Sequence, residues 1–175
     1  MGSRSPGATQ TTRKLIVLFG LGGFTLILDL LSKAVVSKAL TLGQSFDVLD
    51  GILRITYIHN KGAIFGLSVG ESTGSIVLVV SFLAAILIAF YYLRLPIDLK
   101  WQGVGLVLIL SGAVGNLYDR ILFGEVRDFI DIGINKLRWP IFNVADLAVT
   151  AGALLLAMKL TRRSKSQKRN DLRAD

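Results

Sequence analysis

Four apolar stretches of bilayer-crossing length constrain this chain more than any other feature of its sequence. They lie at about residues 15–31, 75–93, 101–122 and 141–158. Each has roughly 17–22 residues, close to the number that a helix needs to cross the hydrocarbon core of a membrane. The mean hydropathy of +0.59 is too high for an ordinary soluble protein of 175 residues. The sequence therefore predicts an all-α membrane protein with four transmembrane helices.

Basic residues flank these stretches in a pattern that predicts their orientation. Arg13 and Lys14 precede the first stretch, Arg94 and Lys100 bracket the link between the second and third, and the tail 161–175 is strongly basic. Because basic flanks favour the cytoplasm, and four crossings put these segments on one side, we expect both termini to be cytoplasmic. The same pattern explains the net charge of +8 without nucleic-acid binding. We expect residues 1–13 to form a flexible tail and 161–175 a basic one, disordered past its first turn.

Two extracytoplasmic loops are then expected, at about residues 33–74 and 123–139. In the first, apolar residues alternate at Leu53, Ile55 and Tyr57, beside the turn signal at 50–51. This alternation predicts a β-hairpin or small sheet. The following GAIFGL segment is apolar and can enter the membrane interface. We therefore expect a small β-sheet and amphipathic loop platform at the outer surface, over about residues 46–68.

Several kinds of site are excluded by composition. The chain has no cysteine, which excludes disulfides, thiol nucleophiles and cysteine-bound metals. It has one histidine, His59, so a site with several histidine ligands is also excluded. A Ser-His-Asp triad would have to use His59, which we expect to be a solvated loop residue. No metal and no organic cofactor is expected.

Two aspartates lie where a membrane protein tolerates them least. Asp146 falls in the early turns of the fourth stretch, and Asp128 falls just before it in VRDFIDI. Carboxylates at a bilayer boundary are costly and usually face a bundle interior or a wet cavity. Two carboxylates that approach each other can share a proton and activate water. Asn143, three residues before Asp146, shares its helix face and could fix a carboxylate or bind a substrate backbone.

The sequence alone leaves other roles open for these two aspartates. Asp146 could instead cap its helix or pair with Arg120 or Arg127. Asp131 is a rival to Asp128 within the same short segment. Because Phe129 and Ile130 follow Asp128, we expect the backbone there to re-enter the membrane interface.

Further polar residues lie near the outer ends of the stretches. Asp29 and Lys33 are four apart on one helix face, so they form either an interfacial salt bridge, with Lys33 reaching toward the headgroups, or a brace for the site. Asn60 and Gly62 provide an amide and a permissive turn, or an ordinary loop corner.

A third polar group lies near the outer end of the third stretch, on one face of its helix. Asn116, Asp119 and Arg120 share that face, and we expect Asp119 and Arg120 to face inward and pair, holding helix to helix. The small residues of the GAVG segment at 112–115 would allow another helix to approach closely.

The motifs LDLLSK, HNKGAIFG, GNLYDR, VRDFID and FNVAD, in this order across four spans, resemble the lipoprotein signal peptidase (signal peptidase II) family. The resemblance covers roughly residues 28–150. It implies a bacterial aspartyl endopeptidase of the cytoplasmic (inner) membrane that removes signal peptides from prolipoproteins, cutting just before a cysteine that carries diacylglycerol. The catalytic aspartates of the family match Asp128 and Asp146. Its other site residues match Asp29, Lys33, Asn60, Gly62, Asn116, Asp119, Arg120, Asn143 and Ala145.

The resemblance also implies partners and a location for the site. The partners are prolipoproteins with a diacylglyceryl-cysteine and membrane lipid, and inhibition by globomycin-type cyclic peptides is expected. The active site would lie near the extracytoplasmic face. This chain departs from the family pattern at His59 and Lys61, which flank Asn60, and at Arg127, where an apolar residue is common.

Two other classes of function compete with a protease. Membrane carboxylates beside an arginine also occur in proton-coupled transporters. However, the polar residues here gather at one end of the spans, there is no two-fold repeat, and a transport path would place some of them near the midplane. A non-catalytic membrane assembly factor is the third hypothesis.

Overall fold

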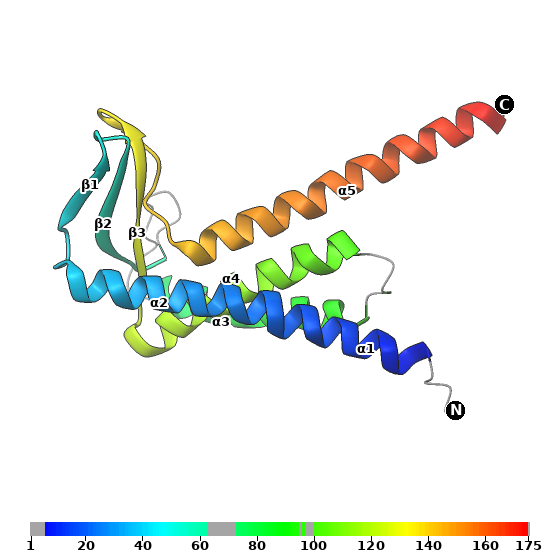
Figure 1. Cartoon of the computed structure of the whole chain (residues 1–175), viewed down its shortest axis with the longest axis horizontal. Helices are drawn as coiled ribbons and strands as arrows, with labels where there is room; N and C mark the ends of the chain where they lie inside the picture. The colour runs from blue at the N-terminus through cyan, green and yellow to red at the C-terminus, as the bar shows by residue number, and fades with distance from the viewer. Residues whose placement is uncertain (1–5, 63–72, 95, 97–99, 175) are drawn as a thin grey trace.

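The first helical segment is a long rod with one irregular turn. In the computed structural model, which describes residues 6–62, 73–94, 96 and 100–174, the rod consists of α1 (Pro6–Val17), the π-helix η1 (Leu18–Gly22) and α2 (Gly23–Ala39). The later elements, drawn in Figure 1, are β1 (Ser45–Leu49), β2 (Leu53–Asn60), α3 (Thr73–Arg94), α4 (Lys100–Phe123), β3 (Val126–Ile134), β4 (Leu137–Arg138) and α5 (Val144–Ala174).

Three helices of the described chain are long and apolar enough to cross a membrane. They are Gln10–Ala39, Gly74–Arg94 and Trp101–Phe123. Large apolar side chains on them, such as Phe19 and Leu87, are mostly exposed, as expected for surfaces that face lipid and not water. The chain is thus a mostly helical membrane protein with a small antiparallel sheet, and the first three predicted spans are confirmed as apolar helices. The fourth predicted span falls on α5, and its crossing of the membrane stays a prediction.

The helices are longer than the apolar pattern indicated. Residues 6–13, expected as a flexible tail, belong to α1, and residues 161–174 continue α5 as helix. Lys33, expected at the start of the outer loop, lies inside α2, because that helix continues to Ala39 without a glycine or proline to end it. The part of the expected platform from Ala63 onward, including most of GAIFGL, lies outside the described residues.

Close backbone contact between α4 and α5 depends on small residues, as the GAVG segment predicted. A Cβ added at Gly112 would lie 2.3 Å from the carbonyl oxygen of Ala145, and one at Gly152 would lie 2.4 Å from that of Gly105. These distances leave no room for a side chain, so glycine is required where the helices cross. The contact brings the first turn of α5 against the outer half of α4.

The helix ends remote from the sheet are held by a small hydrophobic core. Tyr92, Leu106 and Val107 are buried there, and Leu18 and Leu156 pack against them. The Tyr92 hydroxyl donates a hydrogen bond of 2.8 Å to the backbone carbonyl of residue 14. This cluster fixes the first helix against α3 and α4.

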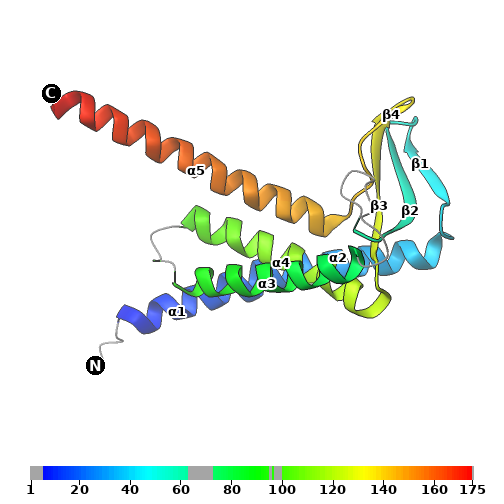
Figure 2. The same cartoon turned by 180° about the vertical axis from the view of Figure 1, so that it is seen from behind.

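The four strands form one antiparallel sheet in the order β1-β2-β3-β4. The predicted hairpin is confirmed: β1 and β2 pair across a turn in which Asp50 and Gly51 have φ values of 38° and 78°, a conformation that favours these residue types. The expected loop 123–139 was only partly right, because its VRDFID motif is the interior strand β3. Figures 1 and 2 show the sheet at one end of the helices, with its strands running across the helix direction, and both termini at the opposite end.

Candidate active site

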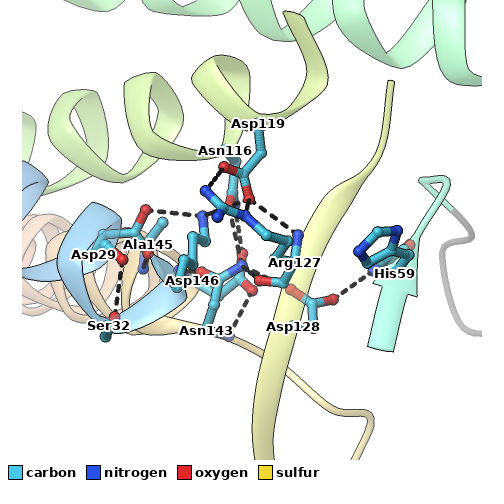
Figure 3. A network of polar contacts seen from close by, with 12 residues as sticks. Asp29, Ser32, His59, Asn116, Asp119, Arg127, Asp128, Asn143, Ala145 and Asp146 are labelled. Carbon is cyan, nitrogen blue, oxygen red and sulfur yellow. Dashed lines mark hydrogen bonds and ion pairs between the residues drawn. The ribbon is translucent and has the colours of Figure 1, made fainter. Parts of the chain in front are cut away.

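The candidate site lies where the sheet meets the helix ends, and five elements contribute to it. Asp128 comes from β3 and Asp146 from the first turn of α5. Helices α2 and α4 and strand β2 supply the polar groups around them, as Figure 3 shows for most of these residues. We call Asp128 and Asp146 the aspartate pair.

Asp146 is held by the helix that it begins. Its backbone N–H donates to Asn143 Oδ1 at 3.0 Å, and its Oδ2 accepts from the backbone N–H of Asn143 at 3.2 Å. These reciprocal hydrogen bonds form a capping box, with Asn143 as N-cap and Asp146 at the third helical position. The capping role expected as an alternative for Asp146 is therefore present, but it uses only one carboxylate oxygen.

Asp128 is buried and held by two side-chain amides. Asn143 Nδ2 donates to its Oδ1 at 2.7 Å, and Asn60 Nδ2 donates to its Oδ2 at 2.9 Å. Burial and, to a smaller extent, the charge of Asp146 together raise the pKa of Asp128 from 3.8 to about 6, against the opposing effect of the hydrogen bonds from the two asparagines. Asp128 is therefore a carboxyl group that keeps its proton to a higher pH, about 6, than an ordinary aspartate.

Asn116 connects the aspartate pair to the helices. Its Nδ2 donates to Asp146 Oδ1 at 2.7 Å, and its Oδ1 accepts from Lys33 Nζ and from Asn143 Nδ2, each at 3.0 Å. Each of the four oxygens of the aspartate pair thus accepts a hydrogen bond from an asparagine.

Asp29 and Lys33 form a buried brace, and the expected alternative of an interfacial salt bridge is wrong. Their exposed fractions are 1% and 0%. Lys33 Nζ lies 2.8 Å from Asp29 Oδ2 and 3.5 Å from Asp119 Oδ2. The other oxygen of Asp29 accepts from the backbone N–H of Ala145 at 2.9 Å. The pair therefore joins α2 to the first turn of α5.

The expected pairing of Asp119 with Arg120 is also wrong. Asp119 instead accepts three hydrogen bonds from Arg127, which the sequence had suggested as a possible partner of Asp146 and not of Asp119. Among the described residues Arg120 forms no hydrogen bond or ion pair, although it lies within electrostatic range of Asp146 and Asp128. Adjacent residues on a helix point in different directions, so Asp119 contacts Arg127 and not its neighbour Arg120.

Asp131, the rival to Asp128, lies on the other face of the sheet. An odd spacing of three along a strand places two side chains on opposite faces. Asp131 forms an ion pair with Arg138 and accepts from the Thr56 hydroxyl at 3.0 Å. It therefore links three strands of the sheet and makes no contact with the aspartate pair.

The turn after β2 supplies Asn60 to the site. Gly62 has a φ of 92°, and its N–H donates to Asn60 Oδ1 at 2.9 Å. Gly62 thus provides the turn that its position predicted, and orients the Asn60 amide toward Asp128. His59 points elsewhere: its ring nitrogens lie 2.8 Å from the Tyr57 hydroxyl and 3.3 Å from Glu125. Within the described ranges, no group of three or more His, Asp or Glu side chains could hold a metal ion.

Comparison with known proteins identifies the family. A family model described as signal peptidase (SPase) II matches residues 21–162. The chain belongs to the signal peptidase II family. The match includes every residue of the candidate site, and it shows that the chain is a member of a family of proteases. The resemblance drawn from the motifs is therefore confirmed.

Named relatives cover most of the chain. It is 39% identical over 159 residues to the lipoprotein signal peptidase of Syntrophus aciditrophicus, covering 89% of this chain and 99% of the relative. It is 40% identical over 148 residues to that of Geobacter metallireducens, covering 84% and 91%. A solved bacterial membrane enzyme superposes with a TM-score of 0.76 at 28% identity, covering 89% of this chain and 91% of the other.

Proposed function

We propose that this protein is a membrane aspartyl endopeptidase that removes signal peptides from diacylglyceryl-modified prolipoproteins, cutting just before the lipid-modified cysteine. The observation that carries the proposal is the position of Asn143, which donates to Asp128 from its side chain and to Asp146 from its backbone. This bridge holds two carboxyl groups of different environment beside each other. The names of the relatives, lipoprotein signal peptidases, support the substrate class.

In the proposed mechanism the aspartate pair shares one proton. Asp146 lies in the first turn of α5, where the helix dipole favours a negative charge. Asp128, with its raised pKa, holds the proton. Ionised Asp146 removes a proton from water as the water oxygen attacks the scissile carbonyl carbon. Asp128 gives its proton to the carbonyl oxygen, which stabilises the tetrahedral intermediate.

Collapse of the intermediate completes the reaction. The carbon–nitrogen bond breaks, the leaving amine takes the proton held by Asp146, and Asp128 regains its proton from the hydroxyl group. Asn60, Asn116 and Asn143 keep the four carboxylate oxygens in place throughout. Arg120, which has no ion-pair partner in the described chain, supports the site by its charge near both carboxyl groups.

The sheet supports the proposal of a platform on the outer membrane surface. Phe46 pairs with Ile55, which pairs with Ile130, and residues paired across strands share a face. Ile130 is two residues from Asp128, so this apolar row lies on the face that carries the catalytic carboxyl. Phe46 and Ile132, on the same face, are exposed. We infer that this face rests on lipid and guides the acyl chains of the substrate toward the aspartate pair.

The proposed location is the bacterial cytoplasmic (inner) membrane, with four spans and an extracytoplasmic site. Both termini lie at the end of the molecule opposite the sheet (Figure 1), which supports an even number of crossings. The basic residues at that end favour the cytoplasm. Membership of a signal peptidase family weighs against the two competing hypotheses, a proton-coupled transporter and a non-catalytic assembly factor.

The test is proteolysis by the purified protein in detergent. A peptide with a diacylglyceryl-cysteine should be cut before that cysteine, and the unmodified peptide should be a poor substrate. Asp128→Asn and Asp146→Asn should each abolish cleavage with helix content unchanged, because an amide cannot act as the base or share the proton. Asp131→Asn is the matched control on the same strand and should keep activity. Substantial turnover by either Asp128→Asn or Asp146→Asn would overturn the assignment of the aspartate pair.

A globomycin-type cyclic peptide provides a second test of the same site. It should inhibit cleavage by the wild-type protein and bind Asp131→Asn as well as wild type. Failure to inhibit at any soluble concentration would contradict the proposed inhibitor class.

A further inference from the structure

Arg127 makes an unusually complete connection to a single carboxylate. Its backbone N–H and its Nε donate to Asp119 Oδ2 at 3.0 and 3.1 Å, and its NH2 group donates to Asp119 Oδ1 at 2.7 Å. The guanidinium also lies 4.6 Å from the centroid of the Phe123 ring. Asp119 and Phe123 are both on the last turns of α4, so Arg127 fastens the first residues of β3 to that helix end.

The connection is buried, so its charges are little screened by solvent. Asp119 has no exposed surface and Arg127 is 9% exposed. Burial alone would lower the pKa of the Arg127 guanidinium, but the hydrogen bonds and charge of Asp119 raise it above its usual value. Asp119 also lies 3.5 Å from Lys33, so the clamp is continuous with the brace of α2.

The segment between the two anchored ends is short. Helix α4 ends at Phe123, Gly124 follows with a φ of 76° and donates to the carbonyl oxygen of Arg120 at 3.0 Å, and β3 begins at Val126. The next residue after Arg127 is Asp128. A shift of the strand start relative to α4 would therefore move Asp128 directly, and would change its position relative to Asn143.

We propose that Arg127 is a positioning residue for Asp128: by clamping the start of β3 to Asp119, it holds the Asp128 carboxyl within reach of Asn143 and Asp146. This inference rests on the proposed function. It assigns a role to a position where the family pattern commonly has an apolar residue. In this chain, the arginine adds a fixed link between the strand that carries one carboxyl and the helix that supports the other.

The geometry explains why arginine serves here. The planar guanidinium offers two parallel donors that match the two oxygens of a carboxylate, and its flat face stacks on an aromatic ring. A lysine ammonium keeps the charge but cannot form this fork. A glutamine keeps neither the charge nor the fork, and among the described residues it leaves Lys33 as the charged partner of the buried Asp119.

The test compares Arg127→Lys and Arg127→Gln with wild type in the lipopeptide cleavage assay, with kcat expressed per folded molecule. Displacement of a catalytic group by about 1 Å can cost on the order of 100-fold in rate. We expect Arg127→Gln to lower kcat by about 10- to 100-fold with KM changed little, and Arg127→Lys to recover part of the loss. The alkaline limb of the pH profile should shift in Arg127→Gln. A displaced Asp128 lies at altered distances from the charges of Asp146, Lys33 and Arg120 and from its asparagine donors, so its pKa changes.

A matched control lies on the same sheet. Arg138 forms an ion pair with Asp131 of β3 and donates to the carbonyl oxygen of Gly51 at 2.8 Å, on the face away from the aspartate pair. Arg138→Gln removes a comparable arginine–aspartate link. It should lower the melting temperature while leaving kcat and the pH profile as in wild type.

The outcomes separate this inference from the proposed function. The positioning role of Arg127 would be supported if Arg127→Gln has a lower kcat per folded molecule and an unchanged KM, and if the alkaline limb of its pH profile shifts. An unchanged kcat and pH profile in both Arg127 variants, or an effect equal to that of Arg138→Gln, would overturn it. If Arg127→Gln does not fold, Arg127→Lys alone decides by the same criteria. Failure of the proposed function itself would appear instead as no dependence of cleavage on Asp128 and Asp146.

Discussion

Asn143 and Asp146 hydrogen-bond each other in both directions, backbone N–H to side chain, at 3.0 and 3.2 Å. The same Asn143 side chain donates to Asp128 at 2.7 Å. One residue thus ends the loop before α5, caps that helix and bridges the aspartate pair. The start of the last helix and the geometry of the candidate catalytic centre depend on the same amide.

These two roles of Asn143 can be separated by substitution. Serine is a good N-cap but has no amide to donate to Asp128, so Asn143→Ser should keep stability near wild type and lose most activity. Asn143→Ala removes both roles and should also destabilise the protein by about 0.5–2 kcal/mol. Thermal unfolding and cleavage rates of both variants check this. Equal activity of Asn143→Ser and wild type would contradict the bridging role.

The pH dependence of cleavage should report the proton on Asp128. Because its pKa is about 6, the active, singly protonated pair is lost as pH rises, and kcat/KM should fall on the alkaline side with a midpoint near that value. The measurement is kcat/KM across pH 4–9 in detergent. A rate that is constant or rising above pH 6 would show that the proton is not on the reaction path.

Folding stability should follow the same group. The pKa of Asp128 in the folded protein is raised above 3.8, so its contribution to stability is complete below pH 3.8 and is lost as pH rises through about 6. This rise corresponds to roughly 3 kcal/mol. The stability of wild type relative to Asp128→Asn should therefore decrease between pH 4 and 7, as measured by thermal unfolding at each pH. A difference that stays constant across this range would contradict the raised pKa.

Two glycines of α4 provide a matched pair for testing the packing. A Cβ at Gly115 would lie 2.5 Å from Asp29 Oδ2, whereas one at Gly103 would lie 3.7 Å from the Tyr92 ring. Gly115→Ala should displace Asp29, cost about 1–3 kcal/mol and reduce activity. Gly103→Ala should be neutral or stabilising by up to about 1 kcal/mol. Melting temperatures compare the two, and similar values would mean that the brace tolerates displacement.

The orientation in the membrane can be tested with single cysteines, since the chain has none. A thiol at Ser45 should react with an impermeant reagent added to intact cells, after removal of any outer membrane barrier. A thiol at Ser164 should react only after the cells are opened. The reverse pattern would place the aspartate pair on the cytoplasmic side.

Much of this fold could be predicted because its signals are local. The length of the apolar stretches correctly predicted three apolar helices that could span a membrane. The Asp50-Gly51 turn, with alternating apolar residues after it, correctly predicted the β1–β2 hairpin. The polar residues that the motifs marked do meet: Asp128, Asp146 and Asn143 lie in one hydrogen-bonded group, which includes the other predicted asparagines and the Asp29–Lys33 brace.

The remainder depends on contacts between distant segments. VRDFID was expected to lie in the loop 123–139, and its strand was missed. Strand β3 is specified by pairing with β2, some 70 residues earlier, and not by its own alternation. The same error left Asp131 as a rival to Asp128, since the opposite-face rule applies only to a strand. The partner of Asp119 was assigned by proximity in sequence to Arg120, whereas the structure brings Arg127 to it.

The buried pair of Asp29 and Lys33 has a consequence for how the chain enters the membrane. Both residues belong to α2, one helical turn apart, so their ion pair forms as soon as that helix forms. Their other partners, Asn116, Asp119 and Ala145, are synthesised much later. Until then, the first span carries two opposite charges that neutralise each other, which lowers the cost of its transfer into lipid. We therefore expect the residues that later brace the site to ease insertion of the nascent helix before its partners are made.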